Sequence, residues 1–213
     1  MKRFREQRGF TLIELAIVMV IIGIILGAVL KGQDLISNAR TKKFINEAGR
    51  EWETASWTYF DRKGKFPGDT DSDGIIGEGG SGTDDPLADI NAASFINPPS
   101  STVTLGSFTF YVFLGSDSTG TPANAKNVLT ICRAADCATA FTADEIAYVE
   151  SFDTAIDGVA DGTTGIVRAV TAAPSVVSAA EALATYAAAG TTNQGAWTAN
   201  TSVALLFYFD RAP

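Results

Sequence analysis

The sequence contains no histidine among its 213 residues. Histidine is the side chain most often used as a general base near neutral pH and the commonest metal ligand, so its absence removes the commonest candidate for each role. The sequence also shows no phosphate-binding loop and no nucleophile placed beside a base. These absences predict that the chain is not an enzyme.

Cysteine is scarce, with only Cys132 and Cys137. Four residues separate them, a spacing that a tight turn brings within disulfide range. If the chain is exported to an oxidising compartment, we expect a disulfide, worth roughly 2–3 kcal/mol by loop entropy. Two reduced, buried thiols are the alternative that the spacing leaves open.

Positive charge is also in short supply. Sixteen lysines and arginines stand against 24 aspartates and glutamates, for a formal net charge of −8. Four of the basic residues lie within Met1–Gly9, so the rest of the chain is more acidic still. Such a surface repels phosphate backbones, and no nucleic-acid partner is expected. It suits exposure to solvent or a divalent cation.

One long hydrophobic run stands out at Phe10–Leu30, FTLIELAIVMVIIGIILGAVL, in which Glu14 is the single charge. A helix of this length covers roughly 30 Å, enough to cross a bilayer core. The basic residues before it would stay in the cytoplasm. Three explanations compete: a secretory signal cleaved after the run, an uncleaved signal anchor, and a cut between Gly9 and Phe10. The first is disfavoured, since residues 27–33 lack a small-x-small cleavage site.

Glu14 bears on that choice. A carboxylate at the centre of a membrane helix costs about 2.5–3.5 kcal/mol, and less near the interface, where Glu14 would lie. One interpretation is a first-turn acid that interacts favourably with the helix dipole. The other is that a cut after Gly9 leaves a cationic amine on Phe10. The Glu14 carboxylate of a neighbouring subunit would then pair with that amine and set the register of assembly.

Residues Arg8–Leu15, RGFTLIEL, resemble the processing site of type IV prepilins and of type II secretion pseudopilins. The resemblance implies cleavage after Gly9 by a prepilin peptidase, methylation of the new amino terminus at Phe10, and an assembly role for Glu14. Many type IV pilins have a proline where this chain has Lys31. Whether the helix melts locally on assembly therefore stays open.

The expected organisation has three parts: a leader at 1–9, a transmembrane and assembly helix at 10–32, and a head at 33–213. Apolar residues continue at helical spacing into the head, which predicts one helix from Phe10 to about Phe60 with one buried face. The members of that face are Thr41, Ile45, Ala48, Trp52, Ala55 and Tyr59. The predicted fold is α+β, with the second half of this helix packed on a mostly antiparallel sheet, as in pilin heads.

The stretch from Lys63 to Ser101 is rich in Gly, Asp, Pro and Ser and predicts a long loop. Within it, Asp69, Asp71 and Asp73 followed by Gly74 match the first half of a calcium loop. The second half does not match, because Gly80 occupies the place of the bidentate glutamate. Candidate substitutes are Glu78, Asp84 and Asp85. Calcium is thus a candidate ligand, and a solvated turn held by aspartates is the alternative.

Further elements are predicted by short-range patterns. The expected strands are Thr102–Leu114, Val128–Cys132, Gly165–Val170 and Ser202–Phe209, and the expected helices are one from Thr142 to about Phe152, opened by a capping box, and one at Ala179–Ala188. A second stretch, with Asp153, Asp157 and Asp161 before glycine-rich turns, is similar to a segment late in many prepilin-type proteins. In this chain Gly158 replaces the second of the paired acids found there, and we expect the aspartates to cap helices or organise the turn.

The function that follows is structural: a subunit of a type IV pilus-like filament. The alternatives are a pseudopilin of a type II secretion system and a minor tip pilin with an adhesive head. The expected partners are copies of the same chain, the prepilin peptidase, the bacterial inner membrane before assembly, and the pilus or secretion machinery. The expected location is the inner membrane as a precursor, then an extracellular filament or a periplasmic pseudopilus.

Overall fold

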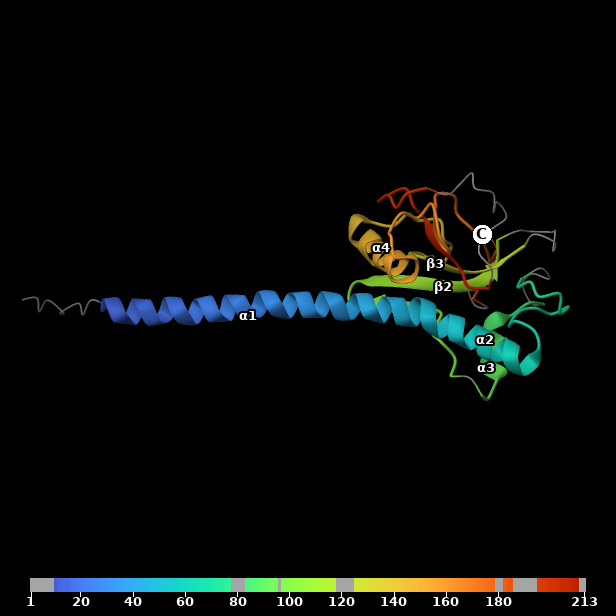
Figure 1. Ribbon diagram of the computed structural model, residues 1–213, viewed down its shortest axis with the longest axis horizontal. Coiled ribbons are helices and arrows are strands. Elements are labelled where there is room, and N and C mark those ends of the chain that lie inside the picture. The colour runs from blue at the N-terminus through green and yellow to red at the C-terminus, as the bar shows by residue number, and fades with distance from the viewer. Residues whose placement is uncertain are drawn as a thin grey trace, which may run out of the picture. The chain divides into compact units, whose positions relative to one another are not determined.

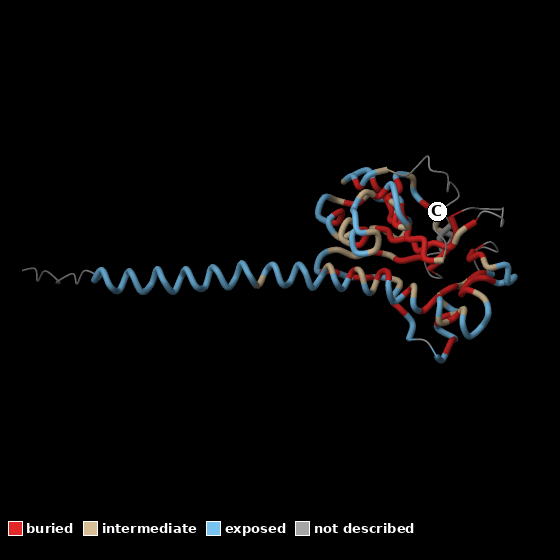
Figure 2. Tube along the Cα trace, viewed as in Figure 1, coloured by how far each residue is buried: buried red, intermediate tan, exposed pale blue. Residues whose placement is uncertain are grey.

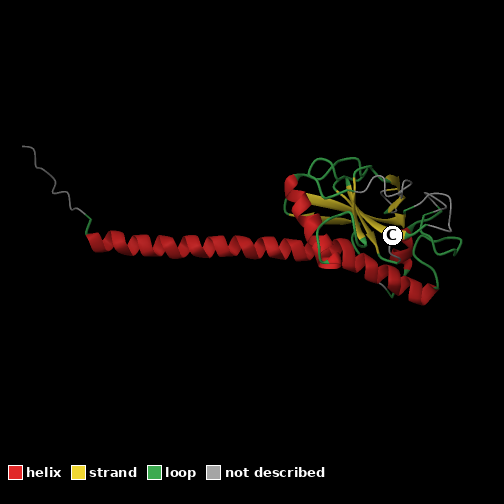
Figure 3. Cartoon of the chain, turned by 45° about the horizontal axis from the view of Figure 1, so that its top comes forward, coloured by secondary structure: helices red, strands yellow, loops and turns green. Residues whose placement is uncertain are grey.

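In the computed structural model of the protein, the described residues are 10–77, 83–95, 97–117, 125–178, 182–185 and 195–210. The chain divides into two compact units, Met1–Arg40 and Thr41–Pro213. The strands lie in the second unit (Figures 1 and 3).

The predicted long helix is confirmed. It consists of α1 (Leu12–Ile45), a π-helical segment η1 (Asn46–Arg50) and α2 (Glu51–Lys63), which follow one another without a break. It ends at Gly64, which has a left-handed φ of 76° and donates its N–H to the carbonyl of Phe60. Glycine is favoured there because a side chain would strain this conformation.

In the first unit the helix is exposed, and over Phe10–Leu30 it is apolar on all sides. Every residue from Phe10 to Arg40 is exposed except the half-buried Gly32 (Figure 2). Among the described residues, this is the one helix that is long and apolar enough to cross a membrane by length and composition. Its apolar surface has no packing partner among the residues that the structure describes in this unit, 10–40, which leaves it available to lipid or to other helices.

In the second unit the helix buries one face, at Phe44, Ala48, Trp52, Ala55 and Tyr59. The predicted face is correct from Ala48 onward. Before that point Thr41 and Ile45 are only half-buried, and Phe44 is buried instead. The π-helical segment accounts for this difference. Its wider turn spaces the buried residues Phe44, Ala48 and Trp52 four positions apart, so that Phe44 takes the buried place predicted for Ile45.

The sheet is mostly antiparallel, as predicted. Its strand order is β4-β7-β3-β2-β6-β5, with β1 also paired to β2, and only the β2–β6 pair is parallel. The strands are β1 (Thr102–Leu105), β2 (Phe108–Ser116), β3 (Asn127–Cys132), β4 (Val167–Val170), β5 (Ser175–Ser178), β6 (Leu183–Thr185) and β7 (Ala204–Tyr208).

Three of the predicted elements were wrong. The single strand predicted at 102–114 is a hairpin that turns at Gly106, whose φ is 69°. The helix predicted at 179–188 is replaced by β6 over Leu183–Thr185, and most of its remaining residues lie outside the described part of the chain. The long loop contains a short helix, α3 (Pro86–Ala92), which Asp85 caps by accepting the N–H of Ala88 at 2.8 Å.

Both faces of the sheet are buried. Side chains alternate along each strand, so Phe110 and Val112 of β2 face the long helix while Phe113 faces the other side. The helix α4 (Ala143–Asp157) packs on the first of these faces, where Phe44 lies in ring contact with Phe110 and Phe152. The capping box predicted at the start of α4 is present, since Glu145 accepts the backbone N–H of Thr142 at 2.8 Å.

The long helix and α4 approach each other closely at Gly49, within the π-helical segment. A Cβ atom added to Gly49 would lie 2.3 Å from Cε2 of Phe152. That ring is fully buried and also contacts Phe44 and Phe207, at centroid distances of 6.0 and 5.6 Å. Only glycine therefore lets the two helices meet here without moving the ring.

We expect Gly49→Ala to lower the free energy of unfolding by roughly 1–3 kcal/mol, because the added methyl group overpacks the contact with Phe152. Urea unfolding of the detergent-solubilised chain, followed by near-ultraviolet circular dichroism, measures the change. In the double variant Gly49→Ala with Phe152→Leu, the penalty of the Gly49 change should shrink. Equal stability of Gly49→Ala and the wild type would contradict this view of the contact.

Candidate functional site

The long helix starts with a capping box that the sequence predictions did not include. One oxygen of the Glu14 carboxylate, Oε2, accepts hydrogen bonds from the backbone N–H of Thr11 at 2.8 Å and from the Thr11 hydroxyl at 2.9 Å. The Thr11 hydroxyl also accepts the N–H of Glu14, at 3.3 Å. The signal was present, since Thr11 and Glu14 have the Thr-x-x-Glu spacing of a capping box.

This arrangement folds the Glu14 carboxylate back toward the start of the helix. Phe10, directly before the cap, is 82 % exposed. Gly9, the other residue of the predicted cleavage site, lies outside the described residues. Glu14 thus satisfies an N–H group that the first turn of a helix leaves without a partner, in addition to any role between subunits.

The three aspartates of the predicted calcium loop lie together. One carboxylate oxygen from each of Asp69, Asp71 and Asp73 lies within 4.8 Å of the others. Asp69 is buried, while Asp71 and Asp73 are exposed. The Asp69 carboxylate accepts the N–H groups of Ser72 at 2.7 Å and of Gly74 at 3.0 Å, one on each oxygen. Both of its oxygens therefore already organise the turn.

The proposed substitutes for the missing glutamate have other partners. Asp84 is buried and accepts the Thr70 hydroxyl, and Asp85 caps α3. Glu78 and Gly80 lie outside the described residues. Burial raises the pKa of the Asp69 carboxyl above its ordinary value, against the lowering effect of the hydrogen bonds from Gly74 and Ser72. Calcium binding stays a prediction.

Asn127, a fully buried residue on β3, fastens this loop to the sheet. Its side-chain oxygen accepts the N–H of Ile76 at 2.9 Å, and its amide donates to the carbonyl of Gly74 at 2.8 Å and to Asp210 at 2.9 Å. The sequence predictions missed Asn127, because it is more than fifty residues from its loop partners and belongs to no motif.

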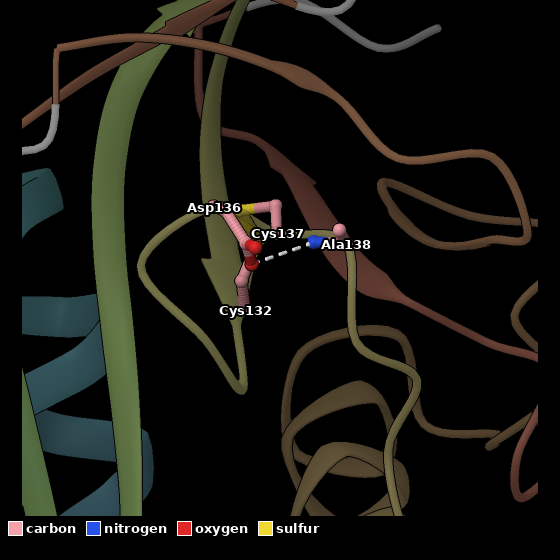
Figure 4. The surroundings of a disulfide bond; sticks show 4 residues. All are labelled: Cys132, Asp136, Cys137 and Ala138. Atoms are coloured by element: carbon pink, nitrogen blue, oxygen red, sulfur yellow. Dashed lines mark hydrogen bonds between the residues drawn. A yellow bond between two sulfur atoms is a disulfide. The ribbon is translucent and has the colours of Figure 1, made fainter.

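Cys132 and Cys137 form a disulfide with a Cα–Cα distance of 5.1 Å (Figure 4). Both cysteines are buried, and the bridge closes the turn that follows β3. Arg133, inside the closed turn, lies 3.1 Å from the Glu145 carboxylate of the α4 capping box. Of the two alternatives left open by the sequence, the bridge rather than the free thiols is present.

The second aspartate cluster, at Asp153, Asp157 and Asp161, organises the turn before β4. Asp153 is fully buried, and its Oδ2 accepts the indole N–H of Trp197 at 2.7 Å and the N–H of Gly162 at 3.0 Å. Asp157 accepts the N–H of Val167 at 2.8 Å. The turn also covers the outer edge of β4, where the carbonyl of Gly162 accepts the N–H of Ala169.

The titration behaviour of the cluster follows from these contacts. Burial raises the pKa of Asp153 above its ordinary value, against the hydrogen bonds from Trp197 and Gly162. Asp161 lies at the surface, and hydrogen bonds from Thr164 and Thr163 lower its pKa to about 2. The pKa values of the two carboxyl groups are therefore shifted in opposite directions.

Comparison with known families bears on the N-terminal site. A family model described as the prokaryotic N-terminal methylation motif matches residues 4–30. The chain carries a prepilin-type signal. This motif confirms the resemblance at Arg8–Leu15, and together with the apolar helix it fits a membrane-anchored precursor. No curated protein and no solved structure matches the chain. The motif supports a type IV pilin-like or pseudopilin protein.

We expect Asp69→Asn to lower the free energy of unfolding by about 1–3 kcal/mol, because one of its two acceptor oxygens becomes an amide that faces a backbone N–H. The matched change at exposed Asp71, Asp71→Asn, should stay within about 0.5 kcal/mol of the wild type. Urea unfolding of the full chain in detergent checks both. If the three carboxylates bind calcium, adding calcium should raise the Tm of the wild type but not the Tm of Asp71→Asn. An unchanged wild-type Tm would mean that the loop is a solvated turn and not a calcium site.

The raised pKa of Asp153 predicts a pH dependence. Its ordinary value is 3.8, and the folded value is higher, so its contribution to stability is fully present below 3.8 and is lost as the pH rises through the folded pKa. Asp153→Asn removes this titration. The Tm of the variant minus that of the wild type should therefore increase between about pH 4 and about pH 7. The exposed variant Asp61→Asn, measured over the same pH range, is the control for the removal of one carboxyl group. If the difference for Asp153→Asn does not change with pH, the prediction of a raised pKa for Asp153 is wrong.

Proposed function

We propose that the chain is a structural subunit of a type IV pilus-like surface filament, processed after Gly9 and assembled through its N-terminal helix. The observation that carries this proposal is the methylation motif at residues 4–30 placed directly on an exposed, all-round apolar helix. In this proposal the head, residues 33–213, is a folded surface domain and not an enzyme.

The apolar surface of Phe10–Leu30 suits two environments in turn. In the inner membrane, lipid covers it; in a filament, the same helices of neighbouring subunits cover it. Lipid tails are as apolar as leucine side chains, so hydrophobic burial gives little preference for one environment over the other. A polar interaction is needed to favour assembly and to fix its register.

Glu14 and the amine created at Phe10 supply that interaction. After cleavage by the prepilin peptidase, the carboxylate of one subunit pairs with the amine of a neighbour in a dry helical core. An unpaired charge there would be strongly unfavourable, and the pair therefore selects one register. The capping box supports this role, because the Thr11 hydroxyl and N–H hold the Glu14 carboxylate at the end of the helix where the amine would lie.

We expect Glu14→Ala to be processed and methylated like the wild type but to enter filaments poorly when both are expressed in one cell, since the variant cannot pair with a neighbour. Asp34→Ala is the matched control. It removes one exposed carboxylate from the same helix, outside the methylation motif, and should enter normally.

Intact-mass spectrometry of filaments sheared from the cell surface measures both the processing and the incorporation of each variant, because each subunit has a distinct mass. The proposal expects masses that begin at methylated Phe10. Assembled material that still contains Met1–Gly9 would overturn the processing step, and equal incorporation of Glu14→Ala would overturn the pairing. Processed subunits retained in the periplasm would identify a pseudopilin instead, and a few copies per filament would identify a minor pilin.

A further inference from the structure

A groove of about 490 Å³ runs along the head beside the long helix. The helix from Asn46 to Thr58 forms one side, and Phe95 and Asn97, which follow α3, form the other. The volume is in the range of ligand sites, roughly 300–1,000 Å³. None of its residues belongs to the methylation motif or to the two aspartate clusters.

The groove begins at the π-helical segment. Asn46 and Arg50, the two ends of that segment, both line it. On its other side the segment carries Gly49, which admits the ring of Phe152. Single π-helical turns inside α-helices occur frequently at functional sites, because the extra residue redirects side chains that a regular helix would place elsewhere. The irregular turn and the groove are therefore two separate observations at one place.

The charges in the groove balance. Its lining includes one cation, Arg50, and one anion, Glu51, and the Arg50 guanidinium is held at 3.1 Å by the Glu53 carboxylate. A phosphate or carboxylate ligand would meet the Glu51 charge, and a cationic ligand would meet Arg50. The electrostatics thus favour a neutral ligand.

The remaining groups are hydrogen-bonding side chains around one aromatic ring. Asn46, Asn97, Thr54 and Thr58 together offer amides and hydroxyls, which both donate and accept. The Thr58 hydroxyl already donates to the carbonyl of Thr54 at 2.7 Å, so it is free only to accept. A purely apolar ligand would desolvate the amides of Asn46 and Asn97 without giving them partners, at a cost in affinity. Phe95 is 39 % exposed, and the Arg62 guanidinium lies 5.8 Å from the centre of its ring.

A sugar ring has the matching chemistry. One face of a pyranose carries C–H groups that stack on an aromatic ring, while its hydroxyls lie around the rim and act as donors and acceptors. We propose that the groove, between the helix from Asn46 to Thr58 and the side chains of Phe95 and Asn97, binds a neutral saccharide, stacked on Phe95 and hydrogen-bonded by the surrounding amides and hydroxyls. This activity does not depend on filament assembly, so it can be tested on the unassembled chain.

The test is saturation-transfer-difference NMR on the full chain in micelles of a detergent without a sugar headgroup. The probes are four neutral disaccharides: cellobiose, maltose, lactose and diacetylchitobiose. At least one of these disaccharides should show saturation transfer from the protein, and the transfer should be strongest for the C–H protons on one face of the sugar ring. Phe95→Ala should weaken its binding about tenfold or more, as loss of a central aromatic contact does.

Val159→Ala is the matched control, since it shortens an apolar side chain that is 64 % exposed and does not line the groove. It should bind like the wild type. Far-ultraviolet circular dichroism confirms that each variant is folded. Absence of transfer to all four probes, or equal binding by Phe95→Ala, overturns the proposal. Concentration-dependent self-association that Phe95→Ala abolishes, without saccharide binding, would make the groove a contact between copies of the chain.

Discussion

The structure depends on one constraint: among the described residues of its own unit, the apolar surface of residues 10–30 has no packing partner. A helix that is hydrophobic on every side is stable only in lipid or among other helices. The methylation motif and the capped Glu14 both lie at the start of this helix. The head differs from this helix, because it must fold in water and its surface is net acidic.

The head is held by a few long-range contacts on a sheet that is buried on both faces. Phe44 joins the long helix to β2 and α4, and Asn127 joins the aspartate loop to β3. The disulfide closes the turn that holds Arg133 against the cap of α4. The Asn127 contacts fix the loop that carries Asp69, Asp71 and Asp73 to the sheet, so the position of this loop does not depend on its local sequence alone.

What could be predicted from the sequence was local. The long helix, the capping box at Thr142, the strands β3, β4 and β7 and the cysteine pair follow from periodicity, spacing and side-chain type. The hairpin at Gly106 was missed because the alternation of β1 and β2 continues across the turn. The strand β6 was missed because its alanine-rich sequence favours a helix, and pairing with β2 and β5 overrides that preference. Asn127 and the groove beside Phe95 are formed by residues far apart in the chain, and no sequence pattern indicates them.

The turn at Asp153–Gly165 has a consequence for solubility. The strand β4 lies at one edge of the sheet. Unpaired backbone groups at such an edge can form hydrogen bonds with a strand of another molecule. Here the N–H of Val167 is bound by Asp157, the N–H of Ala169 by the carbonyl of Gly162, and the carbonyl of Ala169 by the N–H of Gly195. These groups are thus closed to edge-to-edge aggregation. Heads brought to high local concentration are therefore kept from polymerising through this edge of the sheet.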